Sequence, residues 1–469
     1  MGKVRLFKHY IHPAILYLAL VEGFMLIFAF HLSTMTEIQS ETAAARAELA
    51  GWFAPLPLTF AIATVLCMTA MGLYQPQMRE GSGGVIRRTL GAFLAMSLVM
   101  AAIFYILPDL FQWQELFIQT VGAGLVLVLM CRYLFSKLVD RDQLQRRVLV
   151  LGAGRAANTV LHNMRRRSDR VGFKFVGFVN TSADEAIVTG EPIVTISGSL
   201  SDYATTNNID QIVVAVDDRR AGLPIEDLLD SKLHGIQVLD VVSFFEQEAG
   251  KIMLEFVTPG WMVFSDGFQL SLLTRLGKRA LDVTASFLLL MATWPVMLLT
   301  ILAIWLEDGI RAPLVYRQSR VGLHGQLFDV LKFRSMRVDA EKNGKAQWAT
   351  KDDDRITRVG RFIRRSRIDE LPQILNVLSG DMAFIGPRPE RPEFVAELSA
   401  EIPHFAARHY VKPGITGWAQ LCYPYGADAK DAAQKLQFDL YYVKNHSLFL
   451  DFLILISTVE VVLFGKGAR

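Results

Sequence analysis

The first 140 residues contain long apolar runs separated by short polar segments. A helix that crosses a bilayer needs about 20 mostly apolar residues. Four runs reach that length, and they are Ala14–Leu32, Phe53–Leu73, Thr89–Leu107 and Leu116–Phe135. The first run has no small-residue cleavage site and three further runs follow it, so we do not expect a cleaved signal peptide. Residues 1–140 are therefore predicted to form four transmembrane helices.

Charged residues between these runs alternate in sign along the chain. Basic residues lie before the first run, between the second and third runs, and after the fourth run, whereas the other two loops are acidic. The basic residues include Lys3, Arg5, Lys8, Arg79, Arg87, Arg88, Lys137, Arg141, Arg146 and Arg147, and the acidic ones Glu37, Glu41, Glu48, Asp109 and Glu115. Because Lys and Arg favour the cytoplasmic side, both ends of this region are predicted to be cytoplasmic.

Residues 141–270 have a different pattern, in which short apolar runs alternate with segments of helix length. This alternation predicts a parallel sheet covered by helices, a Rossmann-like α/β domain. Gly152, Gly154 and Ala157 follow the first predicted strand as a G-x-G-x-x-A fingerprint for a nucleotide phosphate. The acid expected after the second strand is replaced by Asn180, and no Tyr-x-x-x-Lys pair is present. We therefore do not expect NAD(P) chemistry here, and ligand sensing and a purely structural role both stay open.

A fifth apolar stretch, Leu281–Leu306, contains Pro295, which removes a helical hydrogen bond and kinks a helix. The polar region after it carries more Lys and Arg than Asp and Glu, which disfavours export. We predict a broken, re-entrant helix that enters and leaves on the cytoplasmic side, with a straight span as the alternative. The final stretch, Ser447–Phe464, is interrupted by Asp451 and Glu460 and is predicted to be an interfacial helix.

Composition agrees with a membrane protein. Hydrophobic residues make up 52% of the chain and charged residues only 20%, which is too apolar for an ordinary soluble enzyme. The formal net charge of +3 gives no nucleic-acid footprint, so no nucleic-acid partner is expected. The 3 cysteines are too scattered for a disulfide framework or a zinc cluster.

Groups that suit phosphate chemistry are concentrated in residues 275–469. Guanidinium groups hold phosphates through two parallel hydrogen bonds, and adjacent carboxylates can share one magnesium ion. The basic residues that could hold a phosphate are Arg317, Arg320, Lys332, Arg334, Arg361, Arg364, Arg365, Arg367 and Arg388, and of these Arg320, Lys332 and Arg334 are candidates on their chemistry. Asp369 and Glu370 follow a cluster of arginines and are the candidate carboxylates.

The C-terminal region resembles the bacterial sugar transferase family, the monotopic phosphoglycosyl transferases that act on polyprenyl phosphate. Ordered segments carry the resemblance: Tyr-Arg-Gln-Ser-Arg-Val-Gly (316–322), Leu-Lys-Phe-Arg-Ser-Met (331–336), Arg-Ile-Asp-Glu-Leu-Pro-Gln (367–373), Asn-Val-Leu-Ser-Gly-Asp-Met (376–382), Gly-Pro-Arg-Pro (386–389) and Lys-Pro-Gly-Ile-Thr-Gly-Trp-Ala-Gln (412–420). The apolar front and Rossmann-like middle are similar to the long, exopolysaccharide-initiating branch. Residues 389–395 and 441–451 are similar to the subgroup found beside exosortase (PEP-CTERM) systems.

The resemblance implies a reaction and a site. A UDP-sugar transfers its sugar-1-phosphate to undecaprenyl phosphate, which gives undecaprenyl-diphosphate-sugar and UMP, the first membrane step of exopolysaccharide synthesis. The family's catalytic pair corresponds to Asp369 and Glu370, with Asp369 as the nucleophile and ligand of Mg²⁺. The phosphate-binding arginines correspond to Arg364 and Arg388. The implied location is the bacterial inner membrane, as a multi-pass protein with a cytoplasmic catalytic domain.

Two departures from the family pattern are visible. Trp294 precedes Pro295 where the family often has serine, and Ser335 replaces a threonine. Two other functions remain as alternatives: a membrane-anchored nucleotide-sugar oxidoreductase or epimerase, and a non-catalytic scaffold for polysaccharide export. The sugar, the polysaccharide, the ligand of the middle domain and a homodimeric state are left open by the sequence.

Overall fold

The structure is a computed structural model, and it divides the chain into two compact units, Met1–Ala249 and Gly250–Arg469. The residues that it describes are 4–6, 9–11, 13–37, 55–74, 82–106, 114–138, 145–165, 170, 172–181, 186–196, 198–218, 223–268, 271–309, 312–337, 355–423 and 428–463. Several of the alternating charges lie outside these residues, and they are Lys3, Lys8, Glu41, Glu48, Arg79, Asp109 and Arg141, so the predicted orientation of the helices stays a prediction.

The first unit begins with a short antiparallel hairpin of β1 (Val4–Leu6) and β2 (His9–Ile11), which the sequence analysis did not predict. Four apolar helices follow, and they are α1 (Pro13–Glu37), α3 (Pro55–Ala70), α4 (Ser82–Ile106) and α5 (Gln114–Leu138). Their shared core contains large apolar side chains, including Leu26, Phe60, Met68, Phe93 and Met96. Buried Glu22 pairs with Arg132 within this bundle, with the Arg132 Nε 2.7 Å from a Glu22 carboxylate oxygen. Helices that satisfy their own backbone hydrogen bonds are the arrangement expected of a region predicted to lie in a bilayer.

Three of these helices are long and apolar enough to cross a membrane: the stretches Pro13–Met35, Gly83–Ile106 and Leu116–Phe135. They confirm the first, third and fourth predicted runs as long apolar helices. The helix in the second run, α3, has 16 residues and is shorter than a typical span. Residues 53 and 54 of that predicted run lie outside the described residues, and its span stays a prediction.

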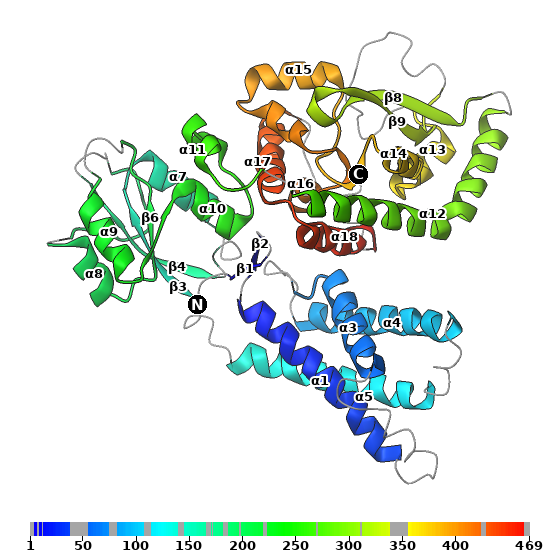
Figure 1. Ribbon diagram of the computed structural model, residues 1–469, viewed down its shortest axis with the longest axis horizontal. Coiled ribbons are helices and arrows are strands. Elements are labelled where there is room, and N and C mark those ends of the chain that lie inside the picture. Colours follow the sequence, from blue (N-terminus) through cyan, green and yellow to red (C-terminus); the bar gives the residue numbers. More distant parts are fainter. Residues whose placement is uncertain are drawn as a thin grey trace. The chain divides into compact units, whose positions relative to one another are not determined.

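The rest of the first unit is an α/β domain with a parallel sheet in the order β5-β4-β3-β6-β7. Its strands are β3 (Arg146–Leu151), β4 (Phe173–Val179), β5 (Ile193–Val194), β6 (Gln211–Val214) and β7 (Gln237–Asp240). Helices α8 (Leu200–Thr206) and α9 (Ile225–Leu233) lie together on one side, whereas α7 (Arg155–Asn163) and α10 (Val241–Ala249) lie on the other (Figure 1). The predicted parallel sheet with covering helices is thus confirmed.

The second unit opens with η2 (Leu254–Phe256), α11 (Pro259–Phe264) and the long helix α12 (Leu272–Asp308). Two strands pair as an antiparallel ribbon, β8 (Val315–Val321) and β9 (Leu327–Phe333), joined by η3 (Leu323–Gly325). The remaining elements are α13 (Arg358–Arg365), η4 (Ile368–Glu370), α14 (Gln373–Ser379), β10 (Ala383–Ile385), α15 (Pro392–Glu401), η5 (Phe405–Tyr410), β11 (Gly414–Thr416), α16 (Trp418–Cys422), α17 (Ala429–Asn445) and α18 (Leu448–Leu463). The unit is mainly helical, as predicted.

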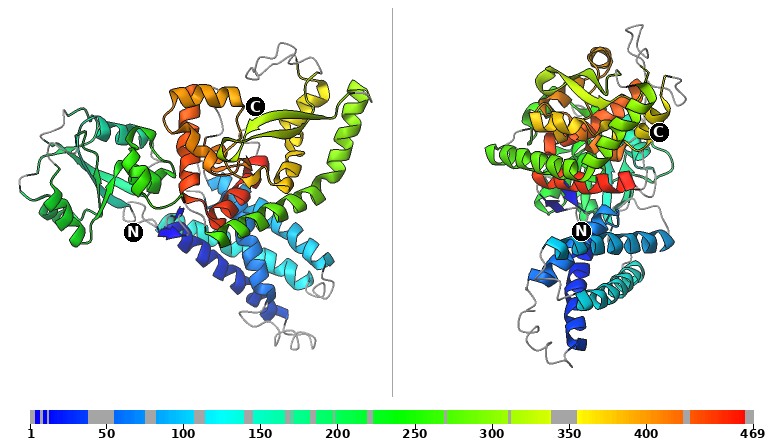
Figure 2. Two further views of the ribbon diagram at one scale, coloured as in Figure 1. Left: turned by 45° about the horizontal axis from the view of Figure 1, so that its top comes forward. Right: turned by 90° about the vertical axis from the view of Figure 1, so that its right-hand side faces the viewer.

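Helix α12 is the fourth helix that is long and apolar enough to cross a membrane. It has 37 residues and stays helical through Pro295, whereas the sequence suggested a broken helix. Its ribbon bends along its course, as both views show (Figures 1 and 2). A proline ring can bend a helix without ending it when its neighbours keep their hydrogen bonds.

The C-terminal helix α18 has 16 residues, fewer than a typical span. Its Asp451 is buried at 1% exposure, where it accepts a hydrogen bond from Lys278 Nζ at 2.9 Å and one from the Tyr442 hydroxyl at 2.6 Å. The charge that interrupts the apolar stretch is therefore used inside the protein to attach α18 to the base of α12.

Candidate active site

The two candidate carboxylates lie on η4, in the short connection between α13 and α14. Arg367, just before this turn, has a left-handed backbone with φ of 60°, which few residues other than glycine adopt. Arg367 lies between the end of α13 at Arg365 and the start of η4 at Ile368, where the chain changes direction. Successive side chains on a 3₁₀ turn point about 120° apart, so Asp369 and Glu370 face different surroundings.

Glu370 is surrounded by three cations, one on β9 and two in connecting segments. Lys332 Nζ of β9 lies 3.1 Å from its Oε1, and Arg388 Nη2 lies 2.8 Å from the same atom. Arg367 Nη1 lies 3.9 Å from Oε2. Burial acts to raise the pKa of Glu370, but Arg388 and Lys332 outweigh it and hold that pKa well below its usual range. Glu370 is therefore a fixed negative charge.

Asp369 has a different environment. It is 9% exposed, and among the described residues none makes a hydrogen bond or ion pair with its carboxyl group. Burial, and next the negative charge of Glu370, raise the pKa of Asp369 to about 6, against the opposing charges of Lys332 and Arg364. Of the two neighbours, Asp369 is the carboxylate whose oxygens remain available to a substrate.

Arg388 reaches Glu370 because its loop is attached on both sides. Strands β10 and β11 pair in parallel so closely that a Cβ on Gly386 would lie 2.3 Å from the Lys412 carbonyl oxygen. The Gly414 amide donates to the Pro387 carbonyl at 2.9 Å. The Gly-Pro-Arg-Pro and Lys-Pro-Gly segments thus need glycine at their contact, and this contact positions Arg388.

A buried ion pair supports the same loop from the other side. Arg408 and Asp439 are 6% and 3% exposed, and their side chains approach to 2.8 Å. Arg408 also donates to the Arg388 carbonyl oxygen at 3.0 Å. The sequence analysis did not identify either residue, because each is an ordinary charged residue in sequence and only the fold brings them together.

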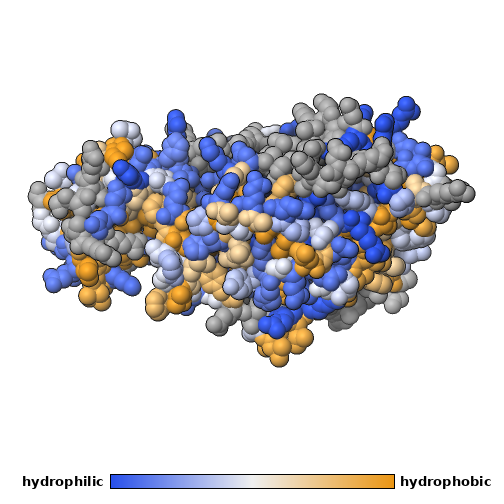
Figure 3. All heavy atoms as spheres, turned by 90° about the horizontal axis from the view of Figure 1, so that it is seen from above, coloured by the Kyte–Doolittle hydropathy of each residue, from blue (hydrophilic) through white to orange (hydrophobic). Residues whose placement is uncertain are grey.

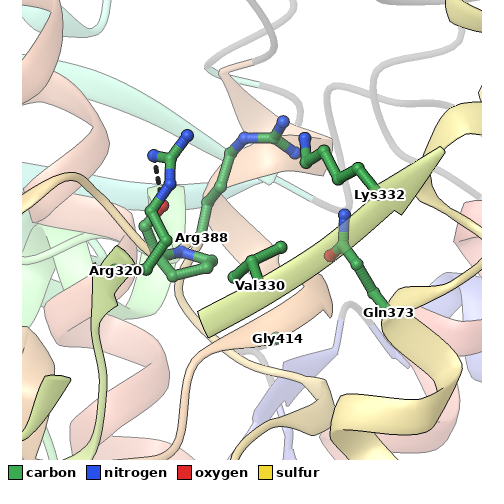
Figure 4. Close-up of a pocket in the computed structure, with 7 residues that line it drawn as sticks. Arg320, Val330, Lys332, Gln373, Arg388 and Gly414 are labelled. Atoms are coloured by element: carbon green, nitrogen blue, oxygen red, sulfur yellow. Dashed lines mark hydrogen bonds between the residues drawn. The ribbon is translucent and has the colours of Figure 1, made fainter. Parts of the chain in front are cut away.

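Lys332 and Arg388 line a small pocket (Figure 4). The ends of the Arg388 and Lys332 side chains lie side by side, and the Gln373 amide of α14 points toward them. Arg320 extends from β8 and donates to the Pro389 carbonyl at 3.0 Å. The lining residues are Arg320, Val330, Lys332, Gln373, Arg388, Pro389 and Gly414. Lys332 and Arg388, which both contact Glu370, thus place positive charge at a small hollow, an arrangement that suits phosphate oxygens.

The structure brings together most of the predicted site residues. Arg320, Lys332 and Arg388 share the pocket, and Arg364 of α13 acts electrostatically on Asp369. Arg334 follows β9, and its buried Nη1 has no hydrogen-bond partner in the part of the chain that the structure describes. Gln373 was missed as a candidate although it lies in the Arg-Ile-Asp-Glu-Leu-Pro-Gln segment, because a glutamine carries no charge signal.

The donors suit a magnesium ion that arrives with a phosphate substrate. The described residues contain no cluster of three or more His, Cys, Asp or Glu that could hold a metal ion. Magnesium often uses only one or two protein carboxylates and takes its other ligands from phosphates and water. Since Glu370 is occupied by Lys332 and Arg388, Asp369 is the oxygen donor left for such an ion.

The glycine fingerprint of the α/β domain has a different use. Gly152 has φ of 125°, and a Cβ on it would lie 2.2 Å from the Ala215 carbonyl oxygen, so close packing against β6 requires glycine. The Asp217 carboxylate accepts from the amides of Arg155 and Ala156 at 2.8 and 2.7 Å. These amides begin α7, where a nucleotide phosphate would bind. The chain's own carboxylate occupies that position.

Comparison with known proteins identifies the family. Residues 273–465 match the model of the bacterial sugar transferases, and residues 69–228 match that of a CoA-binding domain. A UDP-glucose:undecaprenyl-phosphate glucose-1-phosphate transferase of Xanthomonas campestris pv. campestris is 31% identical over 446 residues, 89% of each chain. The chain belongs to the bacterial sugar transferase family. The resemblance drawn from the sequence segments is therefore confirmed.

Other bacterial sugar transferases match more locally. A UDP-N-acetylgalactosamine-undecaprenyl-phosphate N-acetylgalactosaminephosphotransferase of Aeromonas hydrophila is 48% identical over 192 residues, 41% of this chain and 45% of that protein. An undecaprenyl-phosphate glucose phosphotransferase of Komagataeibacter xylinus is 34% identical over 342 residues, 70% of this chain and 60% of that protein. This chain therefore covers about half of the length of the Aeromonas protein and most of the length of the Xanthomonas protein.

Proposed function

We propose that this protein transfers a sugar-1-phosphate from a UDP-sugar to undecaprenyl phosphate and releases UMP. One observation carries the proposal: adjacent carboxylates with opposite environments lie beside a cationic pocket. Glu370 is bound by Lys332 and Arg388, whereas Asp369 is available and its pKa is raised to about 6. This division suits one carboxylate that reacts and one that organises positive charge.

In the first step, an Asp369 carboxylate oxygen attacks the sugar-bearing phosphorus of the UDP-sugar. The bond between that phosphorus and the bridging oxygen breaks, and UMP leaves with the electron pair. Arg388 and Lys332 are placed to stabilise the negative charge on the diphosphate, because both side chains face the pocket. The product is an aspartyl phosphosugar on the enzyme.

In the second step, a phosphate oxygen of undecaprenyl phosphate attacks the same phosphorus and displaces the Asp369 carboxylate. Glu370 keeps Lys332 and Arg388 in position throughout, since both cations contact its Oε1. Asp369 is the residue that would hold Mg²⁺, which when bound supplies neutralising charge to the diphosphate.

The proposed location is the inner membrane, with α12 re-entrant and the catalytic unit cytoplasmic. Both ends of α12 are attached to the same unit: Arg279 donates to the Val377 carbonyl at 2.6 Å, and the Glu307 carboxylate accepts from the Arg358 amide at 2.8 Å. A helix of this length could extend about 55 Å, far more than the hydrocarbon core of a bilayer. The return of both ends to one unit supports entry and exit on one side. We propose domains at residues 1–140, 141–270 and 275–469, as the sequence suggested.

The reaction is tested by measuring UMP release from a panel of UDP-sugars. Purified full-length protein in nanodiscs is supplied with Mg²⁺, with and without undecaprenyl phosphate. The panel contains UDP-glucose, UDP-galactose and UDP-N-acetylhexosamines, because the sequence leaves the sugar open. Lipid-dependent release of UMP supports the proposal and identifies the sugar. Absence of release from every donor, with folded protein, contradicts it.

The pH dependence of kcat/KM is expected to show an acid limb with an apparent pKa of about 6. Asp369 must be ionised to attack, and its raised pKa means that it becomes protonated as the pH falls through that value. The rate should then decrease about tenfold for each further pH unit. Burial raises the pKa of Asp439 to about 6 as well, so Asp439→Asn is the control. The limb should persist in this variant, and its loss would assign the limb to Asp439 instead.

The α/β domain is not expected to bind a dinucleotide or CoA phosphate at the start of α7. Asp217 already accepts from the two amides that such a phosphate would use, and its negative charge repels phosphate. The full chain and its Asp217→Asn variant are each titrated with NAD⁺, NADH and CoA. The parent chain should show no binding at this position, and the substitution should not change any affinity that is measured. Saturable binding with an affinity that depends on residue 217 would contradict this expectation.

A further inference from the structure

Helix α13 presents an exposed basic face that the proposed reaction does not use. Arg358, Arg361 and Arg365 are exposed on it, and Phe362 among them is 67% exposed. Hydrophobic side chains form separate patches on the molecular face of Figure 3, so one exposed phenylalanine is ordinary by itself. Phe362 differs because three arginines surround it on one helix surface.

Helical spacing explains why these residues share a surface. Positions 358, 361, 362 and 365 follow the i, i+3, i+4, i+7 pattern of one helix face. The opposite face is buried through Gly360 and Ile363, and Ile363 packs with Ile304 of α12 and Phe333 of β9. The apolar residues that hold α13 on the unit are thus separate from the basic face, whose side chains the described residues leave exposed.

The helix is attached to the end of α12. The Glu307 carboxylate accepts from the amides of Arg358 and Val359 at 2.8 and 2.9 Å, so it caps the start of α13. On α12 beside this cap, Leu306 is 79% exposed, and Trp305 is 38% exposed. The basic face therefore begins where a long apolar helix ends, which is where a membrane-inserted helix meets the headgroups.

We propose that this face of α13 binds anionic phospholipid headgroups, with Phe362 inserted among them. Guanidinium groups pair with phosphates through charge-assisted hydrogen bonds, and basic helices with an aromatic side chain bind at the lipid–water boundary. Arg364 takes no part, because its charge acts on Asp369 at the active site. The proposal depends on the insertion of α12 in the membrane and is independent of the chemistry at Asp369.

The contact is tested by placing an environment-sensitive fluorophore on Phe362→Cys in the full chain. Cys67, Cys131 and Cys422 are first replaced by alanine. The labelled protein is reconstituted in nanodiscs of phosphatidylcholine alone or mixed with phosphatidylglycerol, each with and without a lipid-borne quencher. Ser399→Cys, at an exposed position on α15, is the matched control. Label at 362 should be quenched by lipid in the anionic discs, and label at 399 should stay in water.

The second experiment measures the same lipid quenching in a variant with glutamine at positions 358, 361 and 365. Three arginines lost from an anionic surface should lower lipid occupancy on the order of 100-fold, so quenching at position 362 should fall. Circular dichroism and gel filtration show whether the variant is folded. UMP and UDP-sugar should not displace the label, because the bound phosphates belong to lipid.

Three results would overturn the proposal. Equal water exposure of the labels at 362 and 399 in anionic discs would show that α13 does not touch the bilayer. Equal quenching in zwitterionic discs, or in the glutamine variant, would show that the arginines are not responsible. Shielding of position 362 without quenching by lipid would show that protein covers this face.

Discussion

Asp369→Asn is expected to abolish UMP release and transfer to undecaprenyl phosphate together. An amide has the same shape as the carboxylate but cannot attack phosphorus as an anion, so both half-reactions lose their common group. Removal of a nucleophile typically costs on the order of 10⁴-fold or more in rate. The variant should fold, because none of the described residues makes a hydrogen bond or ion pair with the Asp369 carboxyl group. The measurement is UMP formation in single-turnover and steady-state assays.

Asp381→Asn is the matched control for this substitution. Asp381 is an exposed aspartate in the same unit, and its carboxylate accepts only a local hydrogen bond from Ser379 among the described residues. It should keep the activity of the parent protein. Turnover within a few-fold of the parent in Asp369→Asn would show that another group forms the covalent bond, and the proposed roles would be wrong. A trapped phosphosugar on Asp369 in the parent, detected by mass spectrometry, would support them directly.

Arg388→Ala is expected to give the second largest effect, a decrease in kcat/KM of about 10²- to 10³-fold. The loss combines two causes. The pocket loses the guanidinium that faces the diphosphate, and Glu370 loses a partner at 2.8 Å. The less compensated charge of Glu370 then disfavours ionisation of its neighbour, so the pKa of Asp369 should increase. The acid limb of the pH profile should therefore move to higher pH, which a loss of substrate contact alone would not cause.

Two variants separate these causes. Arg388→Lys keeps the charge but not the two-pronged geometry, so it should restore the acid limb more fully than the rate. Arg391→Ala is the matched control, because Arg391 lies on the same loop and its guanidinium is 3.5 Å from Glu393. An unchanged pH profile in Arg388→Ala would mean that Arg388 does not set the charge environment of Asp369, contrary to the contacts at Glu370.

The sequence predicted the apolar helices and the parallel sheet because each depends on a local pattern. Runs such as Leu116–Phe135 are long enough to identify a helix of membrane length without knowledge of its neighbours. Buried strands such as β3 and β6 are continuous apolar segments between turns, so their type is also local information. Pro295 was harder to interpret, since packing around a proline decides whether a helix breaks or bends.

The glycine fingerprint shows where local information fails. Gly152 and Gly154 follow a strand as in a nucleotide-binding turn. The first amides of α7, however, donate to the carboxylate of Asp217, a residue about 60 positions further along the chain. No local pattern reports that a distant carboxylate has taken the place of a phosphate. The same reason explains why Arg408 and Asp439 were not predicted, although they hold the Arg388 loop.

By itself, the sequence determined the family, the elements and the residue types of the site, because ordered segments and hydropathy periods are properties of the chain. The tertiary structure decided how the site is organised. It places Lys332 and Arg388 on Glu370 and leaves Asp369 available, so neighbours of nearly identical chemistry have opposite pKa shifts. This difference arises from burial and from charges that are distant in sequence, and such terms exist only once the chain is folded.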